Sequence, residues 1–262
     1  MPRREPARGL RALTLACALM LTVPVAATPS PAPQPTPLAE IAEATVTRWQ
    51  LPGLAVGLIE DGQVTRVVTR GETVAGSGQP VTPHTLFRIA SNSKAMTTAL
   101  LARLVQQGRL DWDDPVTKYL PEFRMHDDWV TRHLRVADLL THASGLPEGG
   151  GDLLLWPAPN AYTRQDVIHA LRFIRPAYAF RTRYEYDNLL YVVAGEVAAA
   201  AGGASYETLL QREVFTPLGL ERCRIGDWQH ARGADVAAAH RPGHGRNIAI
   251  DADATSVHAA TA

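Results

Sequence analysis

The chain has 262 residues, 46% of them hydrophobic and 20% charged, which is the composition of a globular protein and argues against intrinsic disorder. Its 26 basic and 26 acidic residues cancel to a formal net charge of zero, and neither sign forms a long run. An extended nucleic-acid surface is therefore not indicated, and a small-molecule or peptide partner fits better.

Residues 1–27 have the pattern of a secretory signal. Four arginines come before the apolar run ALTLACALMLTVPVAA, which is short for a permanent membrane span and ends in the small residues Val25-Ala26-Ala27. We expect cleavage near Ala27, a secreted or periplasmic protein, and no stable membrane span after cleavage. An uncleaved anchor, or a lipid attached at Cys17, would be the alternatives.

Residues 28–37 (TPSPAPQPTP) place a proline at every second position from 29 to 37, which favours an extended polyproline tether ahead of a domain at 38–262. Cleavage of the signal would leave Cys223 as the single cysteine, so the exported domain would have no internal disulfide. Cys223 has no histidine near it in the sequence and is best interpreted as a buried or spectator thiol.

The elements of this domain follow from hydrophobic spacing. Residues 38–49 repeat apolar side chains at helical intervals, and the apolar runs around Asp61-Gly62 predict a β-hairpin because both turn positions tolerate positive φ. A helical stripe begins at Asn92 and ends at Gly108. Further helical periods follow at 131–140, 165–175, 189–200 and 205–214. The order of hairpin, long helix and mostly helical subdomain predicts an α+β fold without internal repeats.

Ser91 and Lys94 form a Ser-x-x-Lys tetrad where the long helix should begin. Three residues make about one helical turn, so the hydroxyl and the amine can face the same pocket. The backbone N–H of Ser91 belongs to the first turn, which has no intrahelical acceptors, and can point at an oxyanion. The alternative interpretation of the tetrad alone is a capping serine and a solvated lysine.

Six segments, one of which contains the tetrad, together favour the catalytic interpretation. They are, in chain order, LPGLAVGLIEDGQV, TPHTLFRIASNSK, GRLDWDDPVTKYLPEF, LRVADLLTHASGLP, YEYDNLLYVVAGEV and VFTPLGL. As a set, over about residues 38–225, the chain resembles the serine beta-lactamase-like family, which contains class C beta-lactamases, DD-peptidases, D-aminopeptidases and related esterases. The resemblance implies an antiparallel sheet flanked by helices, with a mostly helical subdomain.

The resemblance also implies roles for four residues. Ser91 corresponds to the acylated nucleophile and Lys94 to its activating partner. The family's Tyr-x-Asn motif matches Tyr186 and Asn188, the tyrosine as a proton relay and the asparagine as a hydrogen-bond donor to the substrate amide or to the lysine. The residue between them, Asp187, departs from the serine or alanine common in the family. Its carboxylate could favour cationic substrates or point to solvent.

Three histidines invite other interpretations that we do not favour. His142 and Ser144 lie in the segment LLTHASGLP, where turn and packing roles are expected because no Gly-x-Ser-x-Gly elbow is present. His240 and His244 stand four residues apart, but the Pro-Gly pair between them prevents a regular helix and no carboxylate or cysteine cluster accompanies them. We therefore expect neither a metal site nor another cofactor.

The family's third motif, Lys/His-Ser/Thr-Gly, does not occur in the sequence, and no lysine follows Lys118. That motif lies on a strand that supplies the second oxyanion N–H, and only the Asp61-Gly62 hairpin is evident here. We expect the chain to be an incomplete copy of a longer enzyme, lacking C-terminal strands and hydrolysing little by itself.

Taken together, the sequence predicts an exported serine hydrolase that forms an acyl-enzyme on an amide or ester such as a beta-lactam, a D-amino-acid peptide or an ester. A catalytically impaired fragment or binding-only homologue is the main alternative, and an acyl-transferring esterase is a third. The sequence leaves the oligomeric state open.

Overall fold

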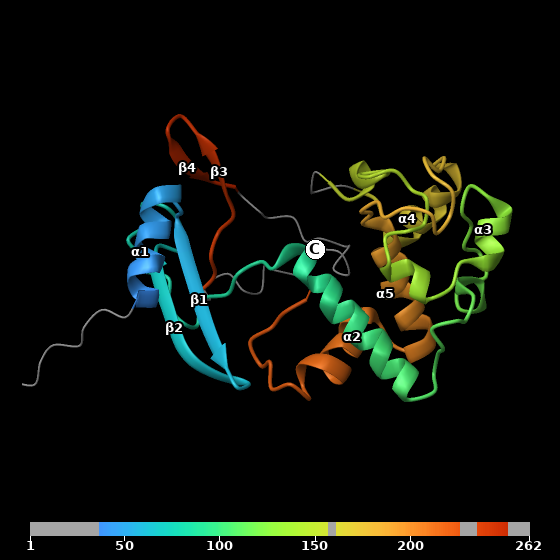
Figure 1. Cartoon of the computed structure of the whole chain (residues 1–262), viewed down its shortest axis with the longest axis horizontal. Helices are drawn as coiled ribbons and strands as arrows, with labels where there is room; N and C mark the ends of the chain where they lie inside the picture. The colour runs from blue at the N-terminus through green and yellow to red at the C-terminus, as the bar shows by residue number, and fades with distance from the viewer. Residues whose placement is uncertain (1–36, 157–160, 226–234, 251–262) are drawn as a thin grey trace, which may run out of the picture. The chain divides into compact units, whose positions relative to one another are not determined.

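The computed structural model describes residues 37–156, 161–225 and 235–250 (Figure 1). The predicted signal lies outside these residues, as does the predicted linker except for its last residue. That residue, Pro37, is the first residue of helix α1 (Pro37–Trp49). Proline suits this position because its missing N–H would have no helical acceptor there.

The first β-hairpin is formed as predicted. Strands β1 (Gly53–Glu60) and β2 (Gln63–Gly71) pair antiparallel, and both turn residues, Asp61 and Gly62, have positive φ, at 50° and 75°. Helix α1 packs on this hairpin, with Ala42 buried and an ion pair from Glu43 to Arg70 at 2.9 Å (Figure 1).

A second hairpin was not expected from the sequence. Strands β3 (His240–Gly243) and β4 (Arg246–Ala249) pair antiparallel across His244 and Gly245, whose φ values of 51° and 71° are again both positive. Strands of four residues are too short to show a clear alternation of hydrophobicity, which is why the pattern missed them. Within the described residues, the sheet structure therefore consists of two two-stranded sheets.

The remaining named elements are helices of three types. The α-helices are α2 (Ser93–Gln106), α3 (Asp128–His133), α4 (Arg164–Ala170), α5 (Leu189–Gly202) and α6 (Tyr206–Leu210). The 3-10 helices are η1 (Ala90–Asn92), η2 (Val116–Lys118), η3 (Ala137–Leu140), η4 (Asp152–Leu154) and η5 (Leu171–Phe173). A π-helical turn, η6 (Gln211–Phe215), continues α6.

The helix predicted at 131–140 is not continuous. Helix α3 ends at His133, and Leu134 is extended, with φ −75° and ψ 119°. The carbonyl of Leu134 accepts a hydrogen bond from Val116 N–H at 3.0 Å, and Arg135 forms an isolated bridge with Pro115. Pairing with a distant segment thus replaces the helical bonds, a tertiary effect that local periodicity does not contain.

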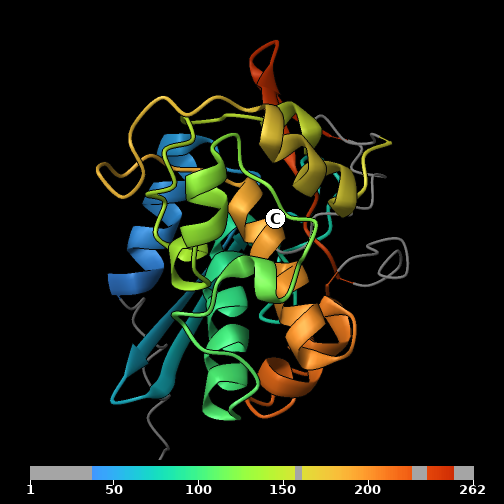
Figure 2. The same cartoon turned by 90° about the vertical axis from the view of Figure 1, so that its right-hand side faces the viewer.

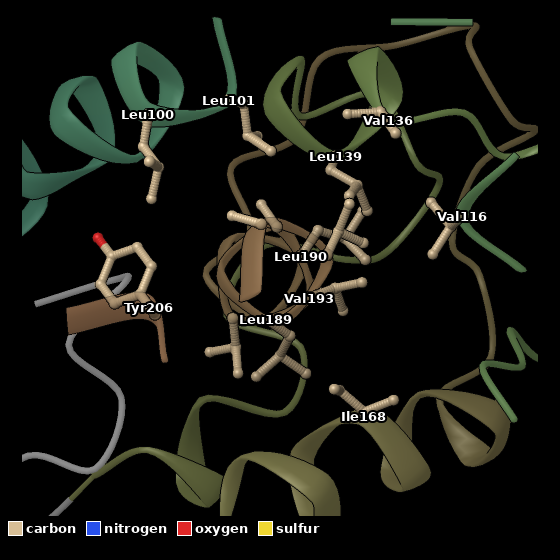
Figure 3. Packing of buried hydrophobic residues seen from close by; sticks show 14 of the residues in the cluster. Leu100, Leu101, Val116, Val136, Leu139, Ile168, Leu189, Leu190, Val193 and Tyr206 are labelled. Carbon is tan, nitrogen blue, oxygen red and sulfur yellow. The ribbon is translucent and has the colours of Figure 1, made fainter. Parts of the chain in front are cut away.

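Helix α5 is the centre of the hydrophobic core. It is apolar on all sides, as expected for a buried helix, and packs against α2, α4, α6 and η3. Helices α2 and α5 are drawn in green and orange in Figure 2. In Figure 3, side chains of these neighbours surround α5, among them Leu101 of α2, Leu139 of η3 and Ile168 of α4. The core thereby holds the start of α5 against the start of α2.

No single helix among the described residues is both long enough and apolar enough to cross a membrane. One pair, Leu189–Gly202 with Tyr206–Phe215, reaches that length and composition only when taken together, and it is bent by 77°.

Candidate active site

Ser91 lies at the start of the long helix, as predicted. It belongs to η1, which leads directly into α2, and its side chain is exposed. The preceding residue, Ala90, has φ 44°, a conformation that costs energy for a residue with a Cβ atom. Strained backbone of this kind is found at functional sites, where surrounding structure holds it. Here the strained residue directly precedes the predicted nucleophile.

Lys94 is buried and its ammonium group faces Ser91. Only 6% of Lys94 is exposed, and its Nζ donates to Ser91 Oγ at 3.2 Å and to Asn188 Oδ1 at 2.9 Å. The Nζ also lies 5.0 Å from the ring centroid of Tyr186 and 5.2 Å from that of Tyr191. Two aromatic faces and an amide oxygen thus surround this nitrogen atom.

Tyr186 comes from the loop that leads into α5 and reaches the same serine. Its phenol oxygen donates to Ser91 Oγ at 2.8 Å, and the side chain is half-buried. The neighbouring Tyr191, on α5, donates to the carbonyl of Leu140 at 3.2 Å, and burial raises the pKa of its phenol. Ser91 Oγ therefore meets one phenol and one amine, the two groups that the sequence assigned to proton transfer.

Asn188 is the N-cap residue of α5, and its amide lies between a cation and an anion. Its Oδ1 accepts from Lys94, while its Nδ2 donates to the two carboxylate oxygens of Asp152 at 3.1 and 3.3 Å. The sequence predicted Asn188 as a possible donor to the lysine. The structure has it accepting from Lys94, because an ammonium group carries only donors.

Asp152 is a site residue that the sequence analysis missed. It begins η4 directly after Gly151, whose φ is 84°. A Cβ atom on Gly151 would lie 2.4 Å from Leu189 Cδ1, so only glycine lets this turn approach the start of α5. The three glycines before Asp152 were the only sequence signal, and they did not reveal which side chain the carboxylate contacts.

The environment of Asp187 matches neither of the two possibilities raised from the sequence, a carboxylate that favours cationic substrates or one that points to solvent. Only 1% of it is exposed, so its carboxylate points neither to solvent nor to an open pocket. Its Oδ1 accepts from Leu190 N–H at 3.0 Å, and its Oδ2 accepts from Ser144 Oγ at 3.5 Å. Asp187 thus caps the first turn of α5 and joins it to the turn at Ser144.

His142 and Ser144 have the turn and packing environment that was expected, and His142 also contacts the site. Both residues are buried. The imidazole of His142 stacks on the ring of Tyr186, with centroids 4.5 Å apart and planes at 29°. His142 therefore forms part of the wall behind Tyr186.

His240 and His244, the two histidines considered for a metal site, have structural positions in and around the second hairpin. His240 Nε2 accepts from Ala75 N–H at 3.1 Å and its Nδ1 contacts the carbonyl of Ala238 at 2.9 Å, while His244 is a turn residue of the second hairpin. Among the residues that the structure describes, there is no group of three or more His, Cys, Asp or Glu side chains that could hold a metal ion.

The chain is similar to several known proteins. A family model described as Beta-lactamase matches residues 38–262. The unguisins hydrolase ungD′ of Aspergillus campestris is 31% identical over 70% of this chain and 35% of its own length. A beta-lactamase of Escherichia coli (strain K12) is 30% identical over 93% of this chain and 63% of its own length.

Among solved structures, the D-amino acid amidase of Ochrobactrum anthropi SV3, complexed with L-phenylalanine amide, matches with a TM-score of 0.69 and 24% identity. The match covers 86% of this chain and 63% of the amidase, and at this identity it shows a shared fold. The chain thus spans between about a third and two thirds of the length of the relatives described here.

Proposed function

Because the chain belongs to the Beta-lactamase family, whose model matches residues 38–262, we propose that it is a serine hydrolase that works through an acyl-enzyme at Ser91. The observation that carries the proposal is the arrangement around one oxygen atom. Ser91 Oγ lies 2.8 Å from the phenol oxygen of Tyr186 and 3.2 Å from Lys94 Nζ. These distances are within the range that direct proton transfer needs.

In the proposed first half-reaction, Ser91 Oγ attacks the carbonyl carbon of an amide or ester. The reactive form of the Tyr186–Lys94 pair has one proton fewer than a phenol plus an ammonium group, so it can accept the Oγ–H proton as the new bond between oxygen and carbon forms. The tetrahedral oxyanion is stabilised by the backbone N–H of Ser91, at the start of the helical segment. The bond to the leaving nitrogen or oxygen then breaks, and the leaving group takes the proton from the pair.

In the second half-reaction, water attacks the acyl carbon and gives its proton to the same pair. The bond between the acyl carbon and Ser91 Oγ breaks, and the proton returns to Oγ. The released product is a carboxylic acid. No redox partner is needed, and each proton taken up by the pair is given back.

The proposed substrate class is a carbonyl compound with an amide or ester bond, such as a beta-lactam, a D-amino-acid peptide or a simple ester. The names of the relatives support this range and do not narrow it, because they include a beta-lactamase and an unguisins hydrolase. Since the chain spans 35% of the first of these relatives, we assign the reaction type and leave the acyl group open.

We also propose that residues 1–27 direct export, since arginines precede a short apolar run that ends in small residues. Expression in a bacterial host followed by N-terminal sequencing of the exported protein tests this. Recovery of a chain that begins near residue 28 is expected. A chain that keeps Met1 in the membrane fraction would support an uncleaved anchor.

Covalent labelling tests the central proposal. The protein is incubated with a fluorophosphonate or a penicillin, and the segment IASNSK is analysed by fragmentation mass spectrometry. We expect the added mass on Ser91. The same segment contains a matched control, since Ser93→Ala removes a hydroxyl two residues away and should leave labelling intact, while Ser91→Ala should abolish it.

Turnover is measured in parallel with a chromogenic ester or nitrocefin. Because the sequence contains no Lys/His-Ser/Thr-Gly triplet, we expect labelling with little or no steady-state hydrolysis, as loss of one oxyanion donor typically costs on the order of 10²–10³ in rate. Robust hydrolysis that Ser91→Ala removes would contradict this expectation and leave the hydrolase proposal standing. Absence of label on Ser91 would instead favour a binding-only homologue.

A further inference from the structure

We propose that His142 is the positioning residue that holds Tyr186 against Ser91. The inference rests on the proposed function, because it assigns His142 a role in the reaction at Ser91. His142 has three separate contacts with the segment around Tyr186, and together they determine where the phenol oxygen lies.

The first two contacts hold the backbone on both sides of Tyr186. Glu185 N–H donates to the carbonyl oxygen of His142 at 2.7 Å, and Asp187 N–H donates to His142 Nδ1 at 3.2 Å. The residue before Tyr186 and the residue after it are therefore bonded to the same histidine. One substitution at position 142 can release the second of these bonds without touching the catalytic segment itself.

The third contact is with the side chain. The imidazole stacks on the Tyr186 ring at 4.5 Å, while the opposite end of Tyr186 donates to Ser91 Oγ at 2.8 Å. Offset stacking of this kind is directional. The imidazole therefore restricts both the plane of the Tyr186 ring and how far this ring extends toward Ser91. Since Nδ1 accepts a backbone N–H, the neutral tautomer with hydrogen on Nε2 is the one that satisfies this geometry.

The surroundings of His142 keep the imidazole in place. Only 8% of the residue is exposed, and its ring also contacts the rings of Tyr184 and Tyr191, each with centroids 5.5 Å away. The buried carboxylate of Asp187 lies 3.9 Å from Nδ1. A histidine fixed on several sides can define the position of Tyr186 better than a mobile side chain.

The backbone of His142 points to the same role. Its φ is 55°, a left-handed conformation that glycine adopts freely and that, among residues with a Cβ atom, asparagine, aspartate and histidine adopt more often than others. If the residue served only to make the turn, glycine would do so without strain. Retention of an imidazole at this φ is explained by the contacts that the side chain makes.

Two variants separate positioning from folding. His142→Gly removes the imidazole and relieves the backbone strain, and His142→Asn tolerates positive φ and keeps a polar acceptor but loses the ring. We expect both to fold, as checked by circular dichroism and thermal unfolding. We expect both to slow fluorophosphonate labelling of Ser91 by about 10- to 100-fold, since a misplacement of about 1 Å can cost 10²-fold.

His133 offers a matched control. Its ring also stacks on an aromatic neighbour, Trp129, at 4.1 Å, but it lies on α3 and contacts none of the site residues named above. His133→Asn should leave the labelling rate within about twofold, the scatter expected for a surface change. Equal losses in His133→Asn and His142→Asn would mean that any stacked histidine matters, and would overturn the assignment.

A double-mutant cycle with Tyr186→Phe gives a readout that a purely structural role would not change. If His142 acts through the phenol of Tyr186, then adding His142→Gly to Tyr186→Phe causes little further loss of rate. Fully additive losses contradict the proposal. Addition of free imidazole should restore part of the labelling rate in His142→Gly and in no other variant.

The outcomes for the two proposals can be told apart. If the wild-type chain is not labelled at Ser91, the proposed function fails. If the wild type is labelled and both His142 variants are labelled at the same rate, the hydrolase proposal stands and the positioning role of His142 is wrong. If His142→Asn fails to fold, His142→Gly and its rescue by imidazole decide between these results. If His142→Gly fails to fold, the labelling rate of His142→Asn relative to His133→Asn decides.

Discussion

At the scale of single residues, the amide of Asn188 is oriented by the charges on its two sides. A flip of the amide would place its NH₂ group against the ammonium of Lys94 and its oxygen against the carboxylate of Asp152. Both charge-assisted hydrogen bonds, at 2.9 Å and at 3.1 Å, would be lost. Asp152 therefore acts on Lys94 through the amide of Asn188.

This arrangement predicts that Asp152→Ala slows labelling of Ser91. Without the carboxylate, the amide can rotate and its oxygen no longer faces Lys94 Nζ at all times. A hydrogen bond to a charged group contributes about 1.5–3 kcal/mol, so a loss of roughly 10- to 150-fold in the labelling rate is expected. The measurement is the rate of mass increase on the Ser91 peptide with a fluorophosphonate.

Glu148→Ala is the control for Asp152→Ala. Glu148 is an exposed acidic residue four positions earlier in the same loop, so its removal changes the net charge equally. If both variants reduce the labelling rate of Ser91 equally, the reduction results from the change in net charge and not from rotation of the Asn188 amide.

The residues of the site differ in how far the sequence could predict them. Ser91, Lys94, Tyr186 and Asn188 were all expected from the resemblance to the serine beta-lactamase-like family, the first two also from their helical spacing, and the structure brings all four together. Asp152 was not expected. Its partner Asn188 lies 36 residues away in the chain, and nothing in the local sequence records that contact.

At the scale of elements, the approach of η4 to α5 depends on a glycine. Gly151→Ala is expected to reduce the free energy of unfolding by about 1–3 kcal/mol more than Gly149→Ala. Both glycines have positive φ, but a Cβ atom at Gly151 meets Leu189 and Ile174, whereas the nearest atom to one at Gly149 is 3.7 Å away. Backbone strain is therefore similar in the two variants, and the difference between their free energies of unfolding measures the cost of packing.

Urea unfolding of the two glycine variants, monitored by circular dichroism, provides the measurement. Equal midpoints would show that η4 moves away from α5 at little cost. In that case Asp152 would not be held rigidly against Asn188, and the expected effect of Asp152→Ala on labelling should also be small.

Elements with strong local patterns were predicted correctly, whereas a helix break caused by distant pairing and a hairpin with very short strands were not. Helices α1, α2 and α5 and the first hairpin follow from hydrophobic spacing and from the Asp61-Gly62 turn. The break after His133 results from the bond between Val116 and Leu134, and the second hairpin has strands of four residues. The break thus depends on a contact between segments far apart in the chain, whereas the strands of the second hairpin are too short to show a pattern.

At the scale of the whole molecule, a buried tyrosine links stability to high pH. The hydroxyl of Tyr206 shares a hydrogen bond with Thr97 at 2.8 Å, and burial raises the pKa of Tyr206 to about 12. In an unfolded chain the pKa of tyrosine is about 10. Between these values the unfolded state ionises and the folded state does not, so stability is complete below about pH 10 and falls as the pH rises towards 12.

Two pKa units correspond to roughly 3 kcal/mol, and this is the contribution that Tyr206 is expected to lose across that range. In Tyr206→Phe, the free energy of unfolding should fall less steeply between pH 9 and pH 12 than in the wild type. Tyr162→Phe, at a 47% exposed position, is the control and should keep the wild-type slope. Parallel slopes for all three proteins would contradict the assignment.

The left-handed φ of Ala90 has a consequence for protein engineering. A strained alanine directly before the nucleophile costs stability of about 1 kcal/mol or more that glycine at the same φ would recover. A screen that selects only for heat resistance should therefore accept Ala90→Gly readily. A screen that selects for fast acylation should reject Ala90→Gly, because glycine at position 90 makes the backbone before Ser91 more flexible and so positions the nucleophile less well.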